Sequence, residues 1–571
     1  MVTMKRRVND LLRFLILVVI LIAVNMLSSQ FFGRYDATSE KRFSLHPATQ
    51  ELVDNFEERI LVRVYLDGDF PSGFQRLSKE TRQMLDEFRA YNSNIEYEFI
   101  NPNGDDDPKV NQQIKNQLAD YGLQPIQVEV TKDGEKRLTE IFPGAVVFMG
   151  DVILPISLLQ SQFATDPEVQ VNSSIQNLEY QFANVFRQLQ IKKKKAIGFL
   201  TGHGELGDKY IADIALRLSA YYSVSRFNLR EVADTADFSL SAQQRRINRF
   251  DAVIIAKPQS QFTDLDKLLI DQYVMSGGKV MWFLDPVFAN MDSLQYASEF
   301  IAYPIADQLN LTDQLFKYGV RVNPNLVMDM VAAGVNDRRS VNRWVYFPMI
   351  MPIEKHPIVK DLNAIKLEFA STLDTITSPG IEKTILLRTS PYTRVVPTPH
   401  RVSLATLYEE PNQAYFSQKH LPVGILLEGE FDSYFANRVI PTESLDPTYT
   451  LIEKGRKTQM LVVADGDVIK NQLNLVNPNI PKGTPLPLGF DQFTGMEFGN
   501  KDFLLNAADF LLDDTGLINI RSRELKIRLL DSNKVQSQRV TWQIINTGVP
   551  VLLILLAGAL YGFIRRRRYT K

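Results

Sequence analysis

An uncharged stretch near the end of the chain places the strongest constraint on what it can fold into. Residues 544–564, IINTGVPVLLILLAGALYGFI, form a run of 21 residues without a charge, and about 20 apolar residues in an α-helix cross the hydrocarbon core of a bilayer. Trp542 and Tyr561 lie where aromatic side chains meet a membrane interface, and a basic tail, residues 565–571, follows at once. We therefore predict a transmembrane helix with its tail in the cytoplasm. The tail begins with Arg565, Arg566, Arg567 and Arg568.

A second apolar stretch, residues 8–27, lies at the start of the chain. It follows the basic residues 5–7, and its only charges, Asp10 and Arg13, are close to its beginning. A secretory signal peptide shares these features, but no A-x-A-like cleavage site follows, which favours an uncleaved transmembrane helix. The basic residues place this end in the cytoplasm as well.

Two such helices with both termini inside would put the body of the chain outside the cytoplasm. In a cell with an outer membrane this space is the periplasm. The sequence therefore predicts a two-pass inner-membrane protein that contacts membrane lipid and carries a large periplasmic domain.

Composition excludes several classes of function. Lys and Arg total 64 and Asp and Glu total 66, so no net positive field would gather phosphates, and nucleic acid is not an expected partner. The absence of cysteine excludes disulfides, thiolate nucleophiles and cysteine-ligated zinc. A length of 571 residues predicts two or three domains.

Residues 31–191 have the pattern of an α/β domain. Two alternating, β-branched strands flank an amphipathic helix, which predicts a βαβ unit, and two hairpins and a closing helix follow. The run of four lysines from Lys192 to Lys195 marks the boundary and is interpreted as a solvated linker rather than a binding patch. Strands are predicted at 60–66 and 95–101, helices at 77–91 and 174–189, and hairpin turns at Asp133-Gly134 and Gly150-Asp151.

Strands and helices alternate strictly from Ala196 in a second predicted domain, residues 196–520. Apolar strands that alternate with amphipathic helices indicate a parallel sheet covered on both faces, so we predict a doubly wound α/β domain. Residues from about 300 to 455 are less regular and are interpreted as an insertion, after which the sheet resumes. The predicted strands are 196–202, 251–258, 279–286 and 459–467, and the predicted helices are 208–220, one from Thr263, 307–318 and 500–514.

The sharpest motif is a polar turn, TGHGE, directly after the first of these strands. In a doubly wound sheet this turn lies at the carboxyl edge, where ligands bind. Asp285 and Asp465, together with Lys257 and Asp467, end other predicted strands and are expected to share this edge. One interpretation is a crevice that binds a small molecule, glycan or peptide; the other is that the glycines turn the chain while the polar side chains cap the next helix or bridge to the next loop. The motif consists of Thr201, Gly202, His203, Gly204 and Glu205.

Motifs for catalysis and for metal binding are absent from the sequence. There is no G-x-S-x-G, no H-E-x-x-H and no cysteine nucleophile, and the five histidines lack metal-ligand spacing. No G-x-x-x-x-G-K-[ST] phosphate loop is present, so the chain is not itself a P-loop ATPase. We therefore expect a non-enzymatic protein with no catalytic residue, metal or cofactor. A hydrolase with an unrecognised site is a less favoured hypothesis.

Three motifs together resemble a known family. TGHGEL after a strand, GGKVMWFLDP, and GNKDFLLNAADFL before a terminal span with a basic tail are similar to the auxiliary, extracytoplasmic subunits of ABC transporters, in particular those associated with bacterial gliding motility. The similarity covers nearly the whole chain, including both anchors and the early RFSLHPAT segment. It implies that the central region is a GIFT-type domain, a fold akin to class I glutamine amidotransferases and shared with an intraflagellar-transport protein.

The resemblance also implies partners and a role. The partners would be a permease subunit and a separate cytoplasmic ATPase subunit, which agrees with the missing phosphate loop. An amidotransferase-like fold would carry a catalytic cysteine at a strand end, and this chain has none, which implies binding or scaffolding rather than hydrolysis. The first hypothesis is a membrane-anchored subunit that serves gliding motility or the associated protein secretion and contacts a substrate or an envelope protein. The alternative is a periplasmic glycan- or peptide-binding module that acts through the crevice.

Overall fold

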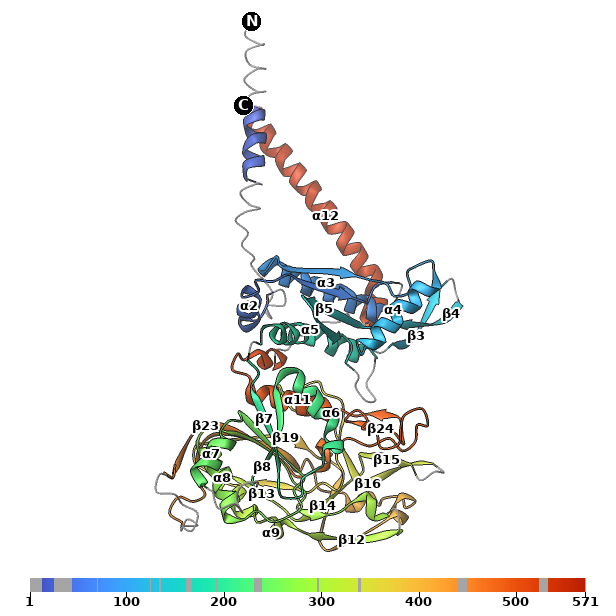
Figure 1. Cartoon of the computed structure of the whole chain (residues 1–571). Helices are drawn as coiled ribbons and strands as arrows, with labels where there is room; N and C mark the ends of the chain where they lie inside the picture. Colours follow the sequence, from blue (N-terminus) through green and yellow to red (C-terminus); the bar gives the residue numbers. More distant parts are fainter. Residues whose placement is uncertain are drawn as a thin grey trace. The chain divides into compact units, whose positions relative to one another are not determined.

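The chain divides into two units, Met1–Arg523 and Glu524–Lys571. In the computed structural model the first unit has a mixed α/β fold, and the described part of the second is a single helix (Figure 1). The structure describes residues 13–24, 44–522 and 532–569, apart from gaps at 69, 124, 133–134, 161–166, 192, 231–238, 295–296, 337–339 and 439–448.

The predicted βαβ unit forms the centre of the N-terminal part of the first unit. β1 (Ile60–Val64) and β2 (Ile95–Phe99) pair in parallel and are joined by α3 (Ser72–Tyr91). β5 (Gly144–Met149) and β6 (Val152–Ser157) extend the sheet with antiparallel pairing, in the order β2-β1-β5-β6. The alternation of apolar residues thus predicts both the strands and the connecting helix correctly.

A long helix, α5 (Pro167–Gln190), closes this part and begins earlier than the sequence pattern predicts. Phe88 of α3 packs edge-to-face on Phe186 of α5, with ring centroids 5.2 Å apart. The predicted hairpin of β3 (Ile126–Lys132) and β4 (Glu135–Ile141) is a separate two-stranded sheet, and its turn, Asp133-Gly134, lies outside the described residues. The other helices here are α2 (Pro47–Asp54) and α4 (Pro108–Asp120).

A seven-stranded sheet organises residues 195–522, in the order β19-β22-β23-β10-β9-β7-β8. The five strands from β8 to β23 are parallel. Four of them correspond to the predicted strands, whereas β8 was not predicted. β22 pairs antiparallel with both β19 and β23. The predicted insertion therefore contributes two strands to the sheet. The strands are β7 (Ala196–Thr201), β8 (Ser223–Asn228), β9 (Ala252–Ala256), β10 (Lys279–Phe283), β19 (Ile381–Arg388), β22 (Pro422–Asp432) and β23 (Lys454–Val463).

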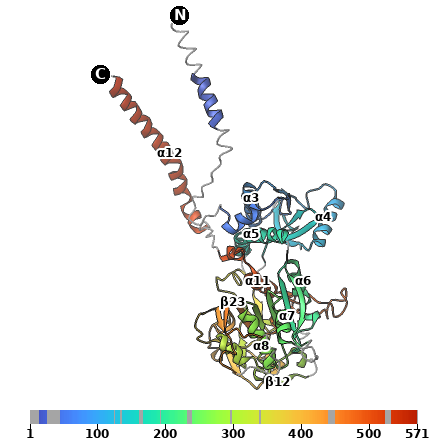
Figure 2. The same cartoon turned by 60° about the vertical axis from the view of Figure 1, so that its left-hand side comes forward.

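Helices cover both faces of this sheet, as the apolar strands predict (Figure 2). Successive strand residues point to opposite faces: Ile255 and Trp282 pack in one core cluster with α7 and α8, and Ile254 and Met281 pack in the other with α6 and α11. The helices are α6 (Ala212–Tyr221), α7 (Leu240–Ile247), α8 (Asp264–Met275) and α11 (Asn500–Leu512).

Two predicted helices differ in the structure. The helix predicted at 208–220 begins with a separate 3₁₀ turn, η1 (Asp208–Tyr210), before α6. The helix predicted at 307–318 is two short helices, α9 (Ala306–Leu309) and α10 (Thr312–Tyr318), because Asn310 ends the first in the left-handed conformation, with a φ of 58°.

Short strands and 3₁₀ turns complete the central part and form small sheets beside the main one. The strands are β11 (Val287–Phe288), β12 (Glu299–Pro304), β13 (Val320–Val322), β14 (Asn325–Asp329), β15 (Ala332–Asn336), β16 (Val341–Ile350), β17 (Ile365–Lys366), β18 (Leu373–Thr375), β20 (Thr393–Pro397), β21 (His400–Ser403), β24 (Phe490–Asp491) and β25 (Met496–Glu497). The 3₁₀ turns are η2 (Met291–Leu294), η3 (Leu404–Leu407), η4 (Gln413–Tyr415), η6 (Asp467–Ile469) and η7 (Leu517–Ser522).

A polar cluster on Asp509 joins the two parts of the first unit. Asp509, on α11, accepts hydrogen bonds from the hydroxyl groups of Tyr222 (2.6 Å) and Tyr180 (3.2 Å). Arg187 donates to the same carboxylate at 2.9 Å. Because Tyr180 and Arg187 belong to α5, this buried carboxylate ties the N-terminal part to the helix layer of the main sheet.

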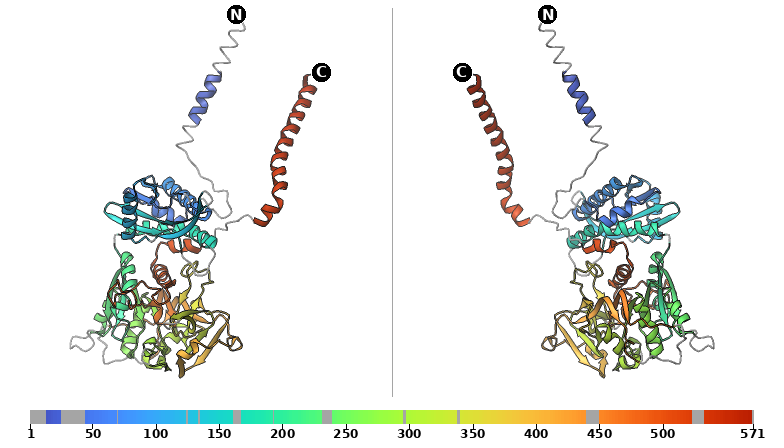
Figure 3. Two further views of the ribbon diagram at one scale, coloured as in Figure 1. Left: turned by 90° about the vertical axis from the view of Figure 1, so that its right-hand side faces the viewer. Right: turned by 90° about the vertical axis from the view of Figure 1, so that its left-hand side faces the viewer.

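The second unit contains α12 (Ser532–Tyr569), which runs as one helix (Figure 3). Its segment Ser537–Arg568 is long and apolar enough to cross a membrane. The predicted span, its aromatic residues and its arginines all lie on this helix. At the other end of the chain, a helix at Arg13–Val24 exposes its apolar side chains, and residues 8–12 and 25–27 of the predicted first span lie outside the described residues.

Candidate functional site

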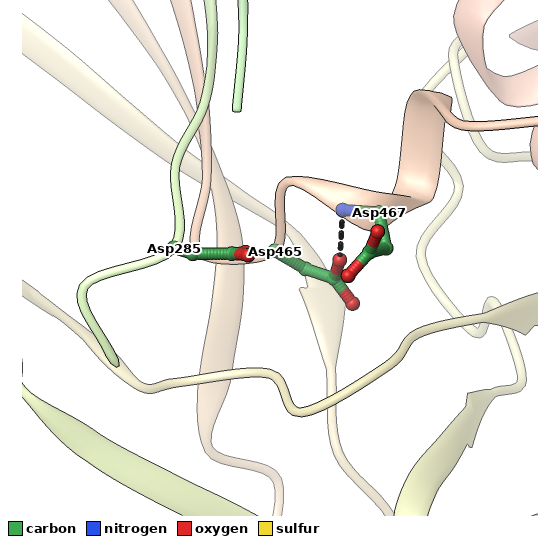
Figure 4. A group of neighbouring side chains, drawn as sticks. All are labelled: Asp285, Asp465 and Asp467. Atoms are coloured by element: carbon green, nitrogen blue, oxygen red, sulfur yellow. Dashed lines mark hydrogen bonds between the residues drawn. The ribbon is translucent and has the colours of Figure 1, made fainter. Parts of the chain in front are cut away.

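Three parallel strands end in charged side chains that meet at the carboxyl edge of the main sheet. Lys257 follows β9, Asp285 follows β10, and Asp465 and Asp467 follow β23. The Lys257 ammonium lies 2.9 Å from Asp285 Oδ2 and donates a hydrogen bond to Asp467 Oδ2. All four side chains are buried. The structure thus brings together the strand ends that the sequence assigns to one edge (Figure 4).

The backbone of this edge is shaped around the lysine. Lys257 has a φ of 53°, a left-handed conformation that is uncommon for residues other than glycine. Gly466 packs directly against it: a Cβ atom at Gly466 would lie 2.7 Å from Lys257 Cβ. The Gly466 N–H also donates to Asp285 Oδ1. The three strand ends are therefore held together by close packing as well as by charge.

Burial and charge act in opposite directions on these groups. Burial alone would lower the pKa of Lys257, but the carboxylates of Asp285 and Asp467 raise it above its ordinary value. Burial would raise the pKa of Asp467, but Lys257 and Lys470 hold it below its ordinary value. Lys257 and Asp467 therefore form a charged pair at neutral pH.

Asp465 and Asp285 have a different electrostatic environment. Burial, followed by the neighbouring carboxylates of Asp285 and Asp467, raises the pKa of Asp465 well above its ordinary value. Burial also raises the pKa of Asp285, despite the nearby Lys257. Asp465 accepts hydrogen bonds from the N–H groups of Asp467 (2.7 Å) and Glu368 (2.6 Å). Through these two hydrogen bonds, Asp465 holds the turn after β23 in place.

The three carboxylates have the composition of a metal site but already have a cation. Oxygens of Asp285, Asp465 and Asp467 lie within 4.8 Å of one another, and carboxylates are ligands for Mg²⁺ and Ca²⁺. Lys257 Nζ contacts two of the three, so an ammonium group of the chain already provides positive charge here. The residues present therefore fit a structural lysine better than a metal ion.

A cavity of about 680 Å³ opens next to this cluster. Asp467 is the member of the cluster that lines it. Lys470 lies one helical turn after Asp467, with its ammonium 3.3 Å from Asp467 Oδ1. Lys366 Nζ lies 3.0 Å from Glu368 Oε1 and 3.4 Å from Asp491 Oδ2. Other lining residues are Tyr210, Val335, Leu473, Leu475 and Phe493.

The cavity combines a charged floor with largely apolar walls, which is the usual composition of a small-molecule pocket. Burial would lower the pKa of Lys366, but Glu368 and Asp491 raise it above its ordinary value. Burial would likewise lower the pKa of Lys470, but Asp467 and Glu368 raise it. Both lysines therefore stay charged, and the arrangement can bind a ligand through ionic contacts and apolar packing.

The TGHGE turn lies at the same sheet edge, but its contacts are with the chain itself. Gly202 and Gly204 have positive φ angles of 116° and 74°, which allow the sharp turn after β7. His203 is fully buried, and its Nδ1 lies 3.3 Å from Glu205 Oε1 and its Nε2 3.1 Å from Asp266 Oδ2. The residues from Thr201 to Glu205 do not line the 680 Å³ cavity.

His203 bridges the turn to the beginning of α8. Its ring stacks on Phe262 at a centroid distance of 3.7 Å. Asp266 belongs to the capping box of α8 with Thr263 and also pairs with Arg230 at 2.9 Å. These contacts correspond to the bridging role that the sequence left open beside ligand binding.

Several lining residues were not predicted from the sequence. Lys366 ends the two-residue strand β17, Asp491 ends the two-residue strand β24, and Glu368 follows β17; strands this short have no periodic pattern that would mark these residues as neighbours. Lys470 could have been found, because it follows Asp467 by three residues in a helical turn, and such pairs contact each other.

Comparison with known proteins places the central part in a family. Residues 194–507, more than half of the chain, match the family described as an ABC-type uncharacterized transport system. The chain belongs to this ABC-type transport system family. Residues 39–148 separately match a domain of unknown function (DUF7088). The chain is thus a transporter-associated protein, and its apolar C-terminal helix indicates association with a membrane.

Individual relatives add little to the family assignment. An uncharacterized protein of Borreliella burgdorferi (strain ATCC 35210 / DSM 4680 / CIP 102532 / B31) is 19% identical over 584 residues, which cover 99% of this chain and 100% of the relative. Among solved structures, the mmIFT52 N-terminal domain aligns over 56% of this chain and 98% of its own, at 13% identity and a TM-score of 0.32. That similarity is too weak to establish a shared fold.

Proposed function

We propose that this chain is a non-enzymatic, membrane-anchored auxiliary subunit of an ABC transporter complex, with its body outside the cytoplasm. The observation that carries the proposal is the family match over residues 194–507 in a chain whose last helix is long and apolar enough to cross a membrane. The motifs that resemble the gliding-motility protein GldG support a role in gliding motility or the associated protein secretion.

The proposed topology is two-pass, with both termini in the cytoplasm. The basic residues at the end of α12 and those that precede the first apolar stretch support this orientation, because cytoplasmic flanks carry an excess of Lys and Arg. In this arrangement residues 31–191 form one periplasmic domain and residues 196–520 a second, GIFT-type domain.

The proposed partners are an ABC permease and a separate ATPase. The chain has no phosphate loop, so a subunit of this kind depends on another protein for ATP hydrolysis. The two apolar helices would pack against the permease in the membrane, and the periplasmic body would contact a substrate or an envelope protein.

The partners are tested by purifying the full chain from its native membrane in a mild detergent and identifying the accompanying proteins by mass spectrometry. We expect a polytopic permease and a P-loop ATPase. Recovery of neither would refute the transporter-subunit assignment. The matched control is the same preparation from cells that carry an untagged chain.

The topology is tested by cysteine labelling, because the chain has no cysteine of its own. Single variants Thr3→Cys, Asp106→Cys and Thr570→Cys report on the start, the body and the end of the chain. In intact spheroplasts a membrane-impermeant maleimide should label only Asp106→Cys. Labelling of Thr3→Cys would refute the cytoplasmic start, and labelling of Thr570→Cys would refute the cytoplasmic tail.

A second candidate function is that of a periplasmic ligand-binding module, supported by the 680 Å³ cavity beside Asp467. Its ligand would be a glycan or a peptide. The predicted motif residues are tested with His203→Ala and Glu205→Ala: loss of ligand binding in a stably folded variant supports a direct role, and loss of stability alone supports the bridging role.

A further inference from the structure

The membrane helix α12 and the residues after it carry side-chain charge of one sign only. Residues 532–571 contain no aspartate and no glutamate. Lys534 and Arg539 precede the uncharged run 544–564, and Arg565 to Arg568 and Lys571 follow it. The positive charge is thus concentrated directly after the run. No side chain of α12 can balance this charge, so a counter-anion must come from outside the helix.

The four arginines from Arg565 to Arg568 surround the helix. α12 continues through all of them to Tyr569, and all four are exposed. Successive residues of an α-helix project about 100° apart, so four in a row point to four different sides. A contact with one protein partner would use a single face, with residues three or four positions apart. A ring of cations instead suits molecules that surround the helix, which in a membrane are lipids.

The arginines reach back toward the apolar part of the helix. Long side chains in an α-helix point toward its N-terminus, which here is the direction of the uncharged run that ends at Ile564. Arg567 shows this direction, because its guanidinium carbon lies 5.5 Å from the centre of the Phe563 ring, one turn earlier. Tyr561 is close to this level, and such aromatic residues mark the membrane interface. The guanidinium groups therefore lie at the depth of lipid headgroups.

Phosphate groups of lipids are the anions available at this depth. A guanidinium group donates two parallel hydrogen bonds to a phosphate, with a geometry that an ammonium group lacks. The phosphate of phosphatidylcholine is balanced by its own choline, whereas phosphatidylglycerol keeps a net negative charge. Clusters of about four to eight basic residues beside a transmembrane helix attract anionic lipids for this reason.

We infer that Arg565 to Arg568 form a ring-shaped binding site for anionic phospholipids, whose phosphate oxygens accept hydrogen bonds from the guanidinium groups. This inference rests on the membrane anchor of the proposed function and adds the class of lipid around it. Anionic lipid is expected to be enriched locally at this end of α12.

The test measures which lipid lies beside the arginines. The variant Leu560→Cys supplies a single, exposed cysteine one turn before them, because the chain has no other, and it is labelled with bimane. The full chain is reconstituted in phosphatidylcholine vesicles that contain a small fraction of spin-labelled phosphatidylglycerol or spin-labelled phosphatidylcholine. Spin labels quench bimane only at short range. We expect phosphatidylglycerol to quench about threefold more strongly; equal quenching would overturn the inference.

The side chains responsible are tested by replacing all four arginines, Arg565 to Arg568, with glutamine, which should bring the quenching ratio to about one. An unchanged ratio would overturn the assignment to these side chains. The matched control replaces the other run of four basic residues, Lys192 to Lys195, with glutamine. It should keep the wild-type ratio, and an equal fall would point to net charge instead. If the arginine variant fails to insert, salt decides: from 50 to 500 mM NaCl the wild-type ratio should fall, and a constant ratio would refute an ionic contact.

Two further comparisons identify the source of the anion. Inorganic phosphate should lower the ratio no more than NaCl at the same ionic strength; a larger effect would indicate a site for soluble phosphate and overturn the lipid assignment. A wild-type ratio of one, with loss of the permease from the arginine variant, would assign the ring to a protein contact. Both leaflets of the vesicles have the same composition, so the ratio is independent of the orientation of α12. Failure here is thus distinguishable from failure of the proposed topology, which maleimide labelling of Thr570→Cys measures.

Discussion

Replacement of Lys257 by methionine tests whether a single ammonium group holds the carboxyl-edge cluster together. Methionine is close to lysine in length and, like lysine, would have to adopt the φ of 53°, so the backbone conformation is common to both proteins. The variant leaves Asp285 and Asp467 buried without their shared cation, with oxygens of both and of Asp465 within 4.8 Å of one another. Removal of one partner from a buried ion pair costs about 3–5 kcal/mol, and we expect a loss of this size in the free energy of unfolding at pH 7.5.

The assay is urea unfolding followed by tryptophan fluorescence. Two of the three tryptophans, Trp282 and Trp344, are fully buried in the central part and report on its unfolding. In the variant, the carboxylates are buried without the lysine, so their folded-state pKa values rise above the unfolded ones. The loss of stability should therefore be full at neutral pH and shrink as the pH falls toward 5, where these groups take up protons.

The matched control is Lys454→Met. Lys454 pairs with Glu430 at 3.5 Å, and both side chains are more than half exposed. Such a surface pair contributes about 0–1 kcal/mol, so this variant should lose no more than that. A loss for Lys257→Met no larger than the control's, or one that is the same at pH 5 and pH 7.5, would refute the electrostatic account of the cluster.

Three further predictions concern the junction, the turn and the membrane helix. Asp509→Ala removes the carboxylate 2.9 Å from Arg187 and leaves it Asp513, at 3.9 Å, so we expect the free energy of unfolding to fall by about 3 kcal/mol. Limited proteolysis at the lysines 193–195 should become faster; unchanged cleavage would contradict this. Burial would lower the pKa of His203, but Asp266 and Glu205 raise it above its ordinary value. Protonated His203 therefore stabilises the fold below the unfolded pKa of about 6.5, and this stabilisation disappears as the pH rises through the higher pKa of the folded protein. The stability difference between wild type and His203→Asn, from urea unfolding, should thus be larger at pH 5.5 than at pH 9. Leu553→Arg places a charge near the middle of α12 at a cost of about 2.5–3.5 kcal/mol, and maleimide labelling of Thr570→Cys in spheroplasts should increase.

The sequence predicts the main elements because apolar periodicity reports directly on burial. Trp282 and Met281 lie on neighbouring positions of β10 and face opposite core clusters, as expected for a strand covered on both sides. The antiparallel strands β19 and β22 were missed as members of the sheet. Their partners are set by contacts between distant segments, and local periodicity carries no information about pairing.

The candidate site is predictable only in part, because local patterns say nothing about contacts between distant segments. Asp285 and Asp465 could be assigned to one edge because each follows a recognisable parallel strand. Lys366 and Asp491 reach the same cavity from two short strands, β17 and β24, that are more than a hundred residues apart in the sequence, so their proximity is a product of tertiary folding. The TGHGE motif is conspicuous in the sequence, yet both ring nitrogens of the buried His203 already contact carboxylates of the chain, those of Glu205 and Asp266.

The protonation states of the carboxyl edge favour binding over proton transfer. Lys257 is held in its charged form by two carboxylates and therefore has no free electron pair with which to act as a nucleophile or base. Asp465, whose pKa is raised, is enclosed behind the cavity and bonded to backbone N–H groups. Asp467 is the member of the cluster that reaches the cavity, and its lowered pKa makes it a poor general base at neutral pH. Asp467 is therefore ionised at neutral pH, and the Lys470 ammonium pairs with it at 3.3 Å on the cavity side of the cluster.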